Sequence, residues 1–178
     1  MTKIDLEQLI KTRRTISDFD ATPIAAETVQ ALLETAIWVP NHRLTQPWRF
    51  EYYTGPAIAK VATAAFPEQS GKKYDKLNAL PGTLLVINSI HEDAGVDGEN
   101  TEATAALIQT FSLLAWAQKI GTAWKTPGYI NKPDFKSALN VAENERVIAM
   151  VHLGTPSGEI KAGREREAAA NRFTVISE

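Results

Sequence analysis

Two clusters of basic residues, one near each end of the chain, have the chemistry to bind an anion. The first cluster, KTRRTIS, combines Lys11, Arg13 and Arg14 with the hydroxyl residues Thr15 and Ser17. A guanidinium matches two phosphate oxygens at once, and a hydroxyl adds one more donor. The spacing alone more strongly favours a second interpretation, in which these basic residues end a helix and stabilise its dipole. Both interpretations stay open at this point.

The second cluster, KAGRER, contains Lys161, Arg164 and Arg166. A charged run is usually a solvated surface, but two such clusters could also converge on one phosphate. The chain has no Walker loop and no G-x-G-x-x-G motif, and GTPSG at 154–158 is read only as a turn after a strand. A bound nucleotide would therefore need a different phosphate-binding device.

The stretch WVPNHRLTQPWRF sets His42 and Gln46 between Pro40 and Pro47, where polar side chains could face a ligand. The alternative is a plain connection between a helix and a strand. His152 lies in an apolar segment and is expected to be a hydrogen-bonded core residue. No histidines have metal-ligand spacing and no G-x-S-x-G is present, so hydrolysis by a metal or by a catalytic serine is not favoured.

Composition narrows the class of protein further. The 178 residues predict one domain, 1–178, and the absence of cysteine removes disulfides, thiolate zinc sites and cysteine nucleophiles. With 19 basic and 21 acidic residues, the net charge of −2 offers no large basic face, so no nucleic acid partner is expected. The opening segment lacks the apolar run of a signal peptide, and no stretch reaches the ~20 apolar residues of a membrane span. The expected location is cytoplasmic.

The elements that position these residues alternate between helices and strands. Asp5 is the expected cap of the first helix, Pro23 is expected in the first turn of the second, Pro40 should end that helix, and Gly121 should end the longest one. Expected helices are 5–13, 22–39, 56–66, 101–121 and 132–141, and expected strands are 48–55, 83–90, 122–126 and 146–156. This order predicts the α+β class, with a central sheet flanked by helices.

Several segments are less regular. Residues 67–82 form either a surface helix or a mobile flap that could cap a pocket, and residues 91–102 are expected to be an acidic loop. The helix 101–121 is apolar on more than one face, which is typical of a central helix or an oligomer interface. The charged run 157–172 leads to a strand-like FTVIS at 173–177. This arm could pair with a sheet edge of a second subunit, join its own sheet, or fray.

Four stretches resemble, in order, segments of the flavin-dependent nitroreductases. RRTISDFDATPI followed by VPNHRLTQPWRF is similar to that family's opening, with its arginine-rich start and Q-P-W-x-F motif. AALIQTFSLLAWAQKIGTAWKT is similar to its central helix and the strand after it, and VIAMVHLGTPSG to its late strand and L-G-x-P turn. The match covers almost the whole chain and is nearest to the small single-domain members from bacteria.

The resemblance implies a central, mostly antiparallel sheet flanked by helices, in a homodimer that exchanges C-terminal arms. It implies two flavin mononucleotides (FMN) at the dimer interface, NAD(P)H as hydride donor, and ping-pong turnover with a small-molecule acceptor such as a nitroaromatic or a quinone. The protein would supply binding and electrostatics, while the flavin carries out the redox chemistry. No catalytic acid or base is expected.

By position, the resemblance assigns roles to both basic clusters and to the proline-bounded loop. Arg13, Arg14 and Thr15 would hold the phosphate and ribityl chain, and His42 and Gln46 would reach the flavin from the other subunit. The remaining expected contacts are Trp124, Lys125 and Thr126 beside the ring, and Arg164 with Arg166 or Lys161 around the phosphate.

One position departs from the family pattern. Many relatives carry a basic residue where this chain has Ser17, close to the part of the ring that gains negative charge on reduction. Ser17 stays among the expected cofactor contacts, and Lys125 is the hypothesised replacement cation. Two other functions remain open: a flavin-binding carrier or sensor with little turnover, and an interaction domain with no cofactor.

Overall fold

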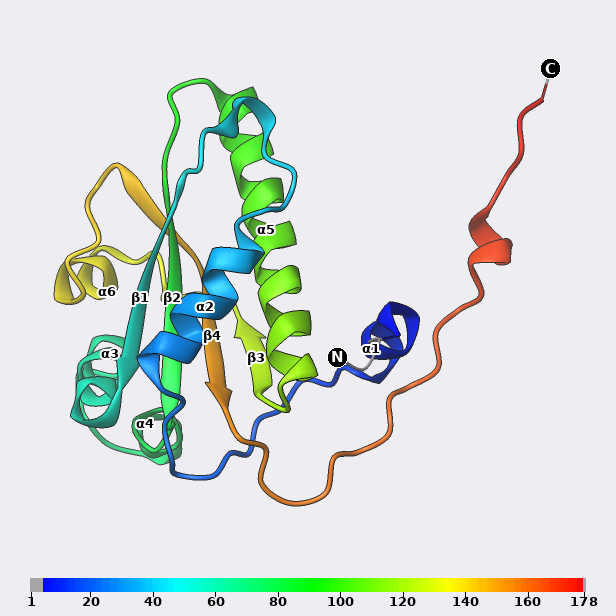
Figure 1. Cartoon of the computed structure of the whole chain (residues 1–178). Helices are drawn as coiled ribbons and strands as arrows, with labels where there is room; N and C mark the ends of the chain where they lie inside the picture. Colours follow the sequence, from blue (N-terminus) through cyan, green and yellow to red (C-terminus); the bar gives the residue numbers. More distant parts are fainter. Residues whose placement is uncertain (1–4, 178) are drawn as a thin grey trace.

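The computed structural model describes residues 5–177 and has a four-stranded sheet at its centre (Figure 1). The strands are β1 (Trp48–Thr54), β2 (Gly82–Ser89), β3 (Gly121–Lys125) and β4 (Glu145–Gly154). Their order is β1-β2-β4-β3, and every neighbouring pair is antiparallel. The α+β class and the mostly antiparallel sheet predicted from the sequence are therefore confirmed.

Helices cover both faces of the sheet, which explains why β2 and β4 read as continuous apolar runs. On one face lie α2 (Ala26–Ala36) and α5 (Ala94–Ala117), and on the other lie α3 (Ile58–Ala65), α4 (Lys72–Asn78) and α6 (Pro133–Ala138). Along β2, Leu84 and Val86 join the α2–α5 core, while Leu85 and Ile87 join the opposite core. Alternate side chains thus separate two hydrophobic layers.

The short helix α1 (Leu6–Thr12) precedes this domain and contributes no buried residue. Asp5 caps it as predicted, because one carboxylate oxygen accepts hydrogen bonds from the backbone amides of Glu7 and Gln8. The 3₁₀ turns His42–Leu44, Gly55–Ala57 and Ala169–Arg172 complete the regular structure of the described residues. The first four residues of the predicted opening segment lie outside that range.

Some boundaries differ from the predictions. Helix α2 begins at Ala26, after Pro23, and ends at Ala36, before Pro40. The segment 67–82 contains the surface helix α4, whose Leu77 packs into the core on the α3–α6 side of the sheet. Of the two alternatives for this segment, the structure thus has the helix.

The expected acidic loop 91–102 is wrong, because α5 already begins at Ala94. The carboxylate of Asp93 caps it by accepting from the amide of Val96 at 2.9 Å. The helix then buries Asn100 and Thr104, and the Thr104 hydroxyl donates to Asn88 on β2 at 3.0 Å. Local acidity suggested a loop, but the cap and these buried hydrogen bonds stabilise a helix.

The end of α5 also differs from the prediction. The left-handed residue after the helix is Lys119, with φ of 61°, and Gly121 is instead the first residue of β3. Gly121 is needed for a close approach: a Cβ there would lie 2.7 Å from Cγ1 of Ile16. The glycine allows residues 15 and 16 to pack directly on β3.

The C-terminal arm is not a strand within this chain. Residues 157–177 are exposed throughout, and residues 173–177 form no ladder with any described residue. The strand expected for FTVIS is therefore absent from the isolated chain. Figure 1 shows the arm running past α1 and away from the domain. Residues 173–177 therefore have no strand partner among the described residues of this chain. Their pairing with a second subunit stays a prediction.

Candidate functional site

The segment after α1 carries the first basic cluster along the edge of β3. The amide of Ile16 donates to the Thr122 carbonyl at 3.0 Å, and Thr15 forms a parallel bridge with Thr122. Ile16 is buried against Gly121, and Thr15, Ile16 and Ser17 all contribute to the lining of one cavity. The close approach at Gly121 therefore fixes the position of this cluster.

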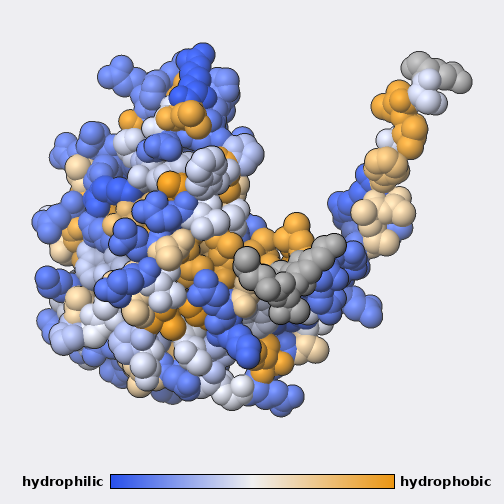
Figure 2. Space-filling view, in the orientation of Figure 1, coloured by the Kyte–Doolittle hydropathy of each residue, from blue (hydrophilic) through white to orange (hydrophobic). Residues whose placement is uncertain are grey.

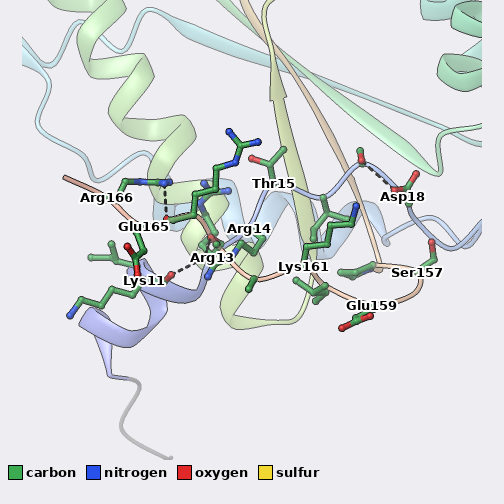
Figure 3. A pocket seen from close by; sticks show the side chains of 18 of the residues that line it. Lys11, Arg13, Arg14, Thr15, Asp18, Ser157, Glu159, Lys161, Glu165 and Arg166 are labelled. Carbon is green, nitrogen blue, oxygen red and sulfur yellow. Dashed lines mark hydrogen bonds between the residues drawn. The ribbon is translucent and has the colours of Figure 1, made fainter. Parts of the chain in front are cut away.

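The beginning of the arm forms the opposite wall of this cavity. It is held to the first segment by the Phe19–Pro156 bridge and by the Ser157 amide, which donates to the Asp18 carbonyl at 3.1 Å. Farther along, a Cβ at Gly163 would lie 2.5 Å from Cζ of Arg14, so the guanidinium packs against the bare backbone. The two clusters, far apart in the sequence, thus meet (Figure 3).

The resulting cavity is large and basic. It encloses about 840 Å³ and is lined by six basic side chains against three acidic ones. The basic ones are Lys11, Arg13, Arg14, Lys161, Arg164 and Arg166, and the acidic ones are Asp18, Glu159 and Glu165. The excess of positive charge, together with the hydroxyls of Thr15 and Ser17, suits an anionic ligand.

The arginines in this cavity repel one another. Burial lowers the pKa of Arg13, and the charges of Arg14 and Arg166 lower it further. Within residues 5–177, none of the cavity's arginines forms a salt bridge with a carboxylate. Arg14 instead donates to the carbonyls of Lys11 and Arg13, at 2.7 and 2.8 Å. A bound anion would relieve this repulsion.

A second, smaller cavity adjoins the first over β3 and α5. Its volume is about 440 Å³, and it shares Arg13, Thr15 and Gln109 with the larger cavity. The other lining residues are Ser112, Thr122, Trp124 and Thr126. Trp124 is 40% exposed and offers an aromatic surface on which a flat ring could stack. The predicted residues Trp124 and Thr126 are thus brought beside the basic cluster.

Three residues of this cavity were not predicted. Gln109 and Ser112 project from α5, and Thr122 lies on β3. The available signal was that Gln109 and Ser112 stand three positions apart in a largely apolar stretch of helix, with Thr110 between them, a spacing that places both on one face.

Lys125 lines neither cavity in this chain, so its predicted contact with a flavin stays a prediction. Side chains alternate along β3, so Lys125 points away from the cavity that Thr122, Trp124 and Thr126 line. It pairs with Met150, which belongs to the core on the α3–α6 face. On that face, the pKa of His152 is lowered to about 4, mainly by burial and also by the positive charge of Lys125.

His152 is a hydrogen-bonded, largely buried residue, as predicted. Its Nδ1 lies 2.9 Å from the hydroxyl oxygen of Thr83 on the neighbouring strand. Burial, followed by the charges of Lys125 and Lys76, holds its pKa low, so the ring is neutral near pH 7. It lines neither cavity and has a structural role.

His42 and Gln46 lie apart from both cavities in this chain. Their loop is tied to the N-terminal part of α5, where the Thr45 hydroxyl donates to the Asn100 side chain at 2.5 Å. Asn100 precedes Gln109 by nine residues, about 13 Å along the helix axis. One subunit therefore does not bring His42 and Gln46 to the basic cluster, and their contact with a flavin in a partner's site stays a prediction.

The same loop holds a rarely populated backbone conformation. Arg43, Leu44 and Gln46 have φ of 56°, 50° and 43°. Asn41 supports it, because its side-chain oxygen accepts from the Gln46 amide at 2.7 Å. Backbone of this kind costs free energy and is concentrated at functional sites. The loop is thus a defined structure that projects exposed side chains outwards.

Two other searches of residues 5–177 complete the description. No group of three or more histidine, aspartate or glutamate side chains is arranged to hold a metal ion. None of the helices in that range has both the length and the hydropathy needed to cross a bilayer.

Comparisons with known proteins identify the family and the fold. The protein named "Putative NAD(P)H nitroreductase YfhC" from Bacillus subtilis (strain 168) is 34% identical over 96% of this chain and 94% of its own length. The crystal structure of a nitroreductase-like family protein from Bacillus cereus covers 99% of this chain and 98% of its own, with a TM-score of 0.91 at 24% identity. A "putative nitroreductase in complex with fmn" from Desulfovibrio desulfuricans covers 99% of both chains, with a TM-score of 0.78 at 21% identity. These two structures establish the fold. The model of the nitroreductase family matches residues 10–155, and the chain therefore belongs to the nitroreductase family.

Proposed function

We propose that the protein is an FMN-dependent oxidoreductase that passes hydride from NAD(P)H to nitroaromatic, quinone or related small-molecule acceptors. One observation carries the proposal: a basic cavity adjoins a cavity lined by Trp124, and the two share Arg13, Thr15 and Gln109. The basic cavity suits an anionic phosphate, and the cavity lined by Trp124 suits a flat ring. The three shared residues would contact the short polar chain that joins the two. The FMN-bound relative and the NAD(P)H-named relative support the assignment.

The residues present fit FMN. Arg13, Arg14, Arg164 and Arg166 would hold the phosphate, because guanidinium groups bind phosphate oxygens in pairs. Thr15 and Gln109 would bind the ribityl hydroxyls, and Trp124 and Thr126 would flank the ring. When bound, the flavin accepts a hydride from NAD(P)H and passes two electrons to the acceptor, which takes up protons from solvent.

We propose a ping-pong sequence for this reaction. The donor and the acceptor would use the same cavity beside Trp124 in turn, so the oxidised nicotinamide would leave before the acceptor binds. A nitro group would take two electrons and two protons and release water as it becomes a nitroso group. The chain's contribution would be to bind and orient these groups and to stabilise charge.

We also propose that the active form is a homodimer with exchanged arms. Leu6 and Ile10 on α1 are exposed by 62% and 51%, and Phe173 and Ile176 on the arm by 74% and 88%. Figure 2 has hydrophobic surface over the C-terminal half of α5 and beside α1, and again at the end of the arm. Exposed apolar surface of this extent is typical of an interface.

The sheet offers one edge for the exchanged arm. β3 is already bridged by Thr15, whereas β1 pairs with β2 alone, so the outer edge of β1 is open in the described chain. A partner's residues 173–177 would add a strand there and satisfy its backbone groups. The partner's loop would bring His42 and Gln46 to the ring.

The visible spectrum during one turnover tests the function. A yellow protein with bound FMN should bleach on addition of NADH or NADPH without oxygen, and should recover its colour when a nitroaromatic or quinone is added. A yellow protein that the donor does not bleach would support the carrier or sensor, and a protein that binds no added FMN would exclude both flavin functions.

A further inference from the structure

Arg13 differs from the other cations of the site in its position. Among residues 5–177 it is the one charged residue that lines both cavities. Arg14, Lys161, Arg164 and Arg166 line only the larger one. Arg13 lies at the C-terminal cap of α1, where its amide donates to the Leu9 carbonyl at 3.1 Å, so its backbone is fixed.

The guanidinium of Arg13 has no hydrogen bond to any described residue, whereas two of its neighbours are engaged. Arg14 donates to two backbone carbonyls, and Arg166 donates to the Arg164 carbonyl at 3.0 Å. The half-buried Arg13 is also repelled by the charges of Arg14 and Arg166. A negative charge placed on the far side of Arg13 from these two residues would therefore be stabilised.

The smaller cavity is otherwise neutral. Its six remaining lining residues are Thr15, Gln109, Ser112, Thr122, Trp124 and Thr126, and none carries a charge. Lys125 is on the opposite face of the sheet, and Ser17 is an uncharged residue of the larger cavity. Among residues 5–177 of this subunit, Arg13 is thus the only cation that lines the smaller cavity and meets a charge that develops there.

We propose that Arg13 stabilises the reduced cofactor, in addition to helping to hold its phosphate. This inference rests on the function proposed above. A hydride brings two electrons and one proton to the neutral ring, so the net charge of the cofactor falls by one. A fixed cation beside that charge binds the reduced form more tightly than the oxidised form and raises the midpoint potential. Arg13 would thus take the role that the sequence suggested for Lys125.

The test compares Arg13→Gln with Arg166→Gln, which removes a charge from the larger cavity alone. FMN dissociation constants and the two-electron midpoint potential are measured for each variant by spectroscopic titration without oxygen. For Arg13→Gln, the reduced cofactor should lose at least tenfold more affinity than the oxidised one. A tenfold difference lowers a two-electron potential by about 30 mV. Arg166→Gln should weaken both forms equally and leave the potential unchanged, as should Lys125→Met.

Riboflavin, which lacks the phosphate, separates ring effects from phosphate effects and is used if Arg13→Gln binds FMN too weakly. The midpoint potential of protein-bound riboflavin should fall in Arg13→Gln. It should stay near the value of the unmodified protein in Arg13→Lys and should not change in Arg166→Gln. Equal potentials in the unmodified protein and Arg13→Gln, with either flavin, would overturn the inference while leaving the proposed function intact. Failure of the unmodified protein to bind any flavin would instead contradict the proposed function.

Discussion

Replacing Gly121 by alanine should displace the segment that carries the first basic cluster. A Cβ at position 121 would lie 2.7 Å from Cγ1 and 2.8 Å from Cβ of Ile16. Both are far inside van der Waals contact, and Ile16 is only 8% exposed, so the segment has to move off β3. Overpacking of this kind costs about 1–3 kcal/mol. The movement should also lengthen the hydrogen bond from the Ile16 amide to the Thr122 carbonyl.

The expected result is a coupled loss of stability and of FMN affinity. For a chain of this size, 1 kcal/mol corresponds to roughly 2–4 °C in the melting temperature, so Gly121→Ala should melt about 2–12 °C lower. FMN should bind at least about tenfold more weakly, since Arg13, Thr15 and Ser17 move with the segment and the loss of even one charge-assisted hydrogen bond is worth ~1.5–3 kcal/mol.

The assay is thermal unfolding of the cofactor-free protein at one fixed concentration, followed by FMN titration. The fixed concentration matters because the melting temperature of an oligomer depends on it. Gly128→Ala is the matched control, since a Cβ at Gly128 meets nothing within 4 Å. If Gly121→Ala melted and bound FMN like Gly128→Ala, the argument that this glycine positions the basic cluster would be refuted.

Two other predictions concern the opposite face of the sheet and the arm. The pKa of His152 is about 4 in the folded protein against ~6.5 in the unfolded chain, so the free energy of unfolding should fall as the pH falls from about 6.5 through 4. In urea unfolding measured from pH 7.5 to 4.5, His152→Gln should flatten this decline. An unchanged dependence of the free energy of unfolding on pH would contradict the prediction. Removing residues 169–178 keeps every residue of both cavities but deletes Phe173 and Ile176. Burying each of these side chains is worth ~1.5–3 kcal/mol, so the dissociation constant of the dimer, measured by sedimentation, should rise at least about 100-fold. A truncated chain that stays equally dimeric would exclude arm exchange.

The sequence predicted best where one local rule decides the structure. Continuous apolar runs identified β2 and β4, because helices cover both faces, and Asp5 marked the start of α1. The acidic stretch 91–102 misled because it forms the start of α5, which depends on the cap at Asp93 and on a hydrogen bond between the buried residues Thr104 and Asn88. Such hydrogen bonds leave no periodic signal in the chain.

For the candidate site, the basic clusters were visible in the sequence but their meeting was not. Nothing local indicates that the arm returns to pack Gly163 against Arg14. For Lys125, strict alternation along a strand already indicates that its side chain lies on the face opposite Trp124 and Thr126. The spacing of Gln109 and Ser112 was visible in the sequence, but their position beside Trp124 follows only from the packing of α5 on β3.

The arm connects the candidate site to the proposed dimer, and this connection has a thermodynamic consequence. Its first part, through Arg166, walls the basic cavity, while its last part carries Phe173 and Ile176 into solvent. A phosphate held between the two walls restricts the first part, so less conformational entropy remains to be lost when the last part binds a partner. If the dimer forms by arm exchange, FMN must therefore favour dimerisation, and by reciprocity dimerisation must favour FMN by the same factor. The cofactor site and the subunit interface would then behave as one cooperative unit, although Arg13 and Ile176 do not touch.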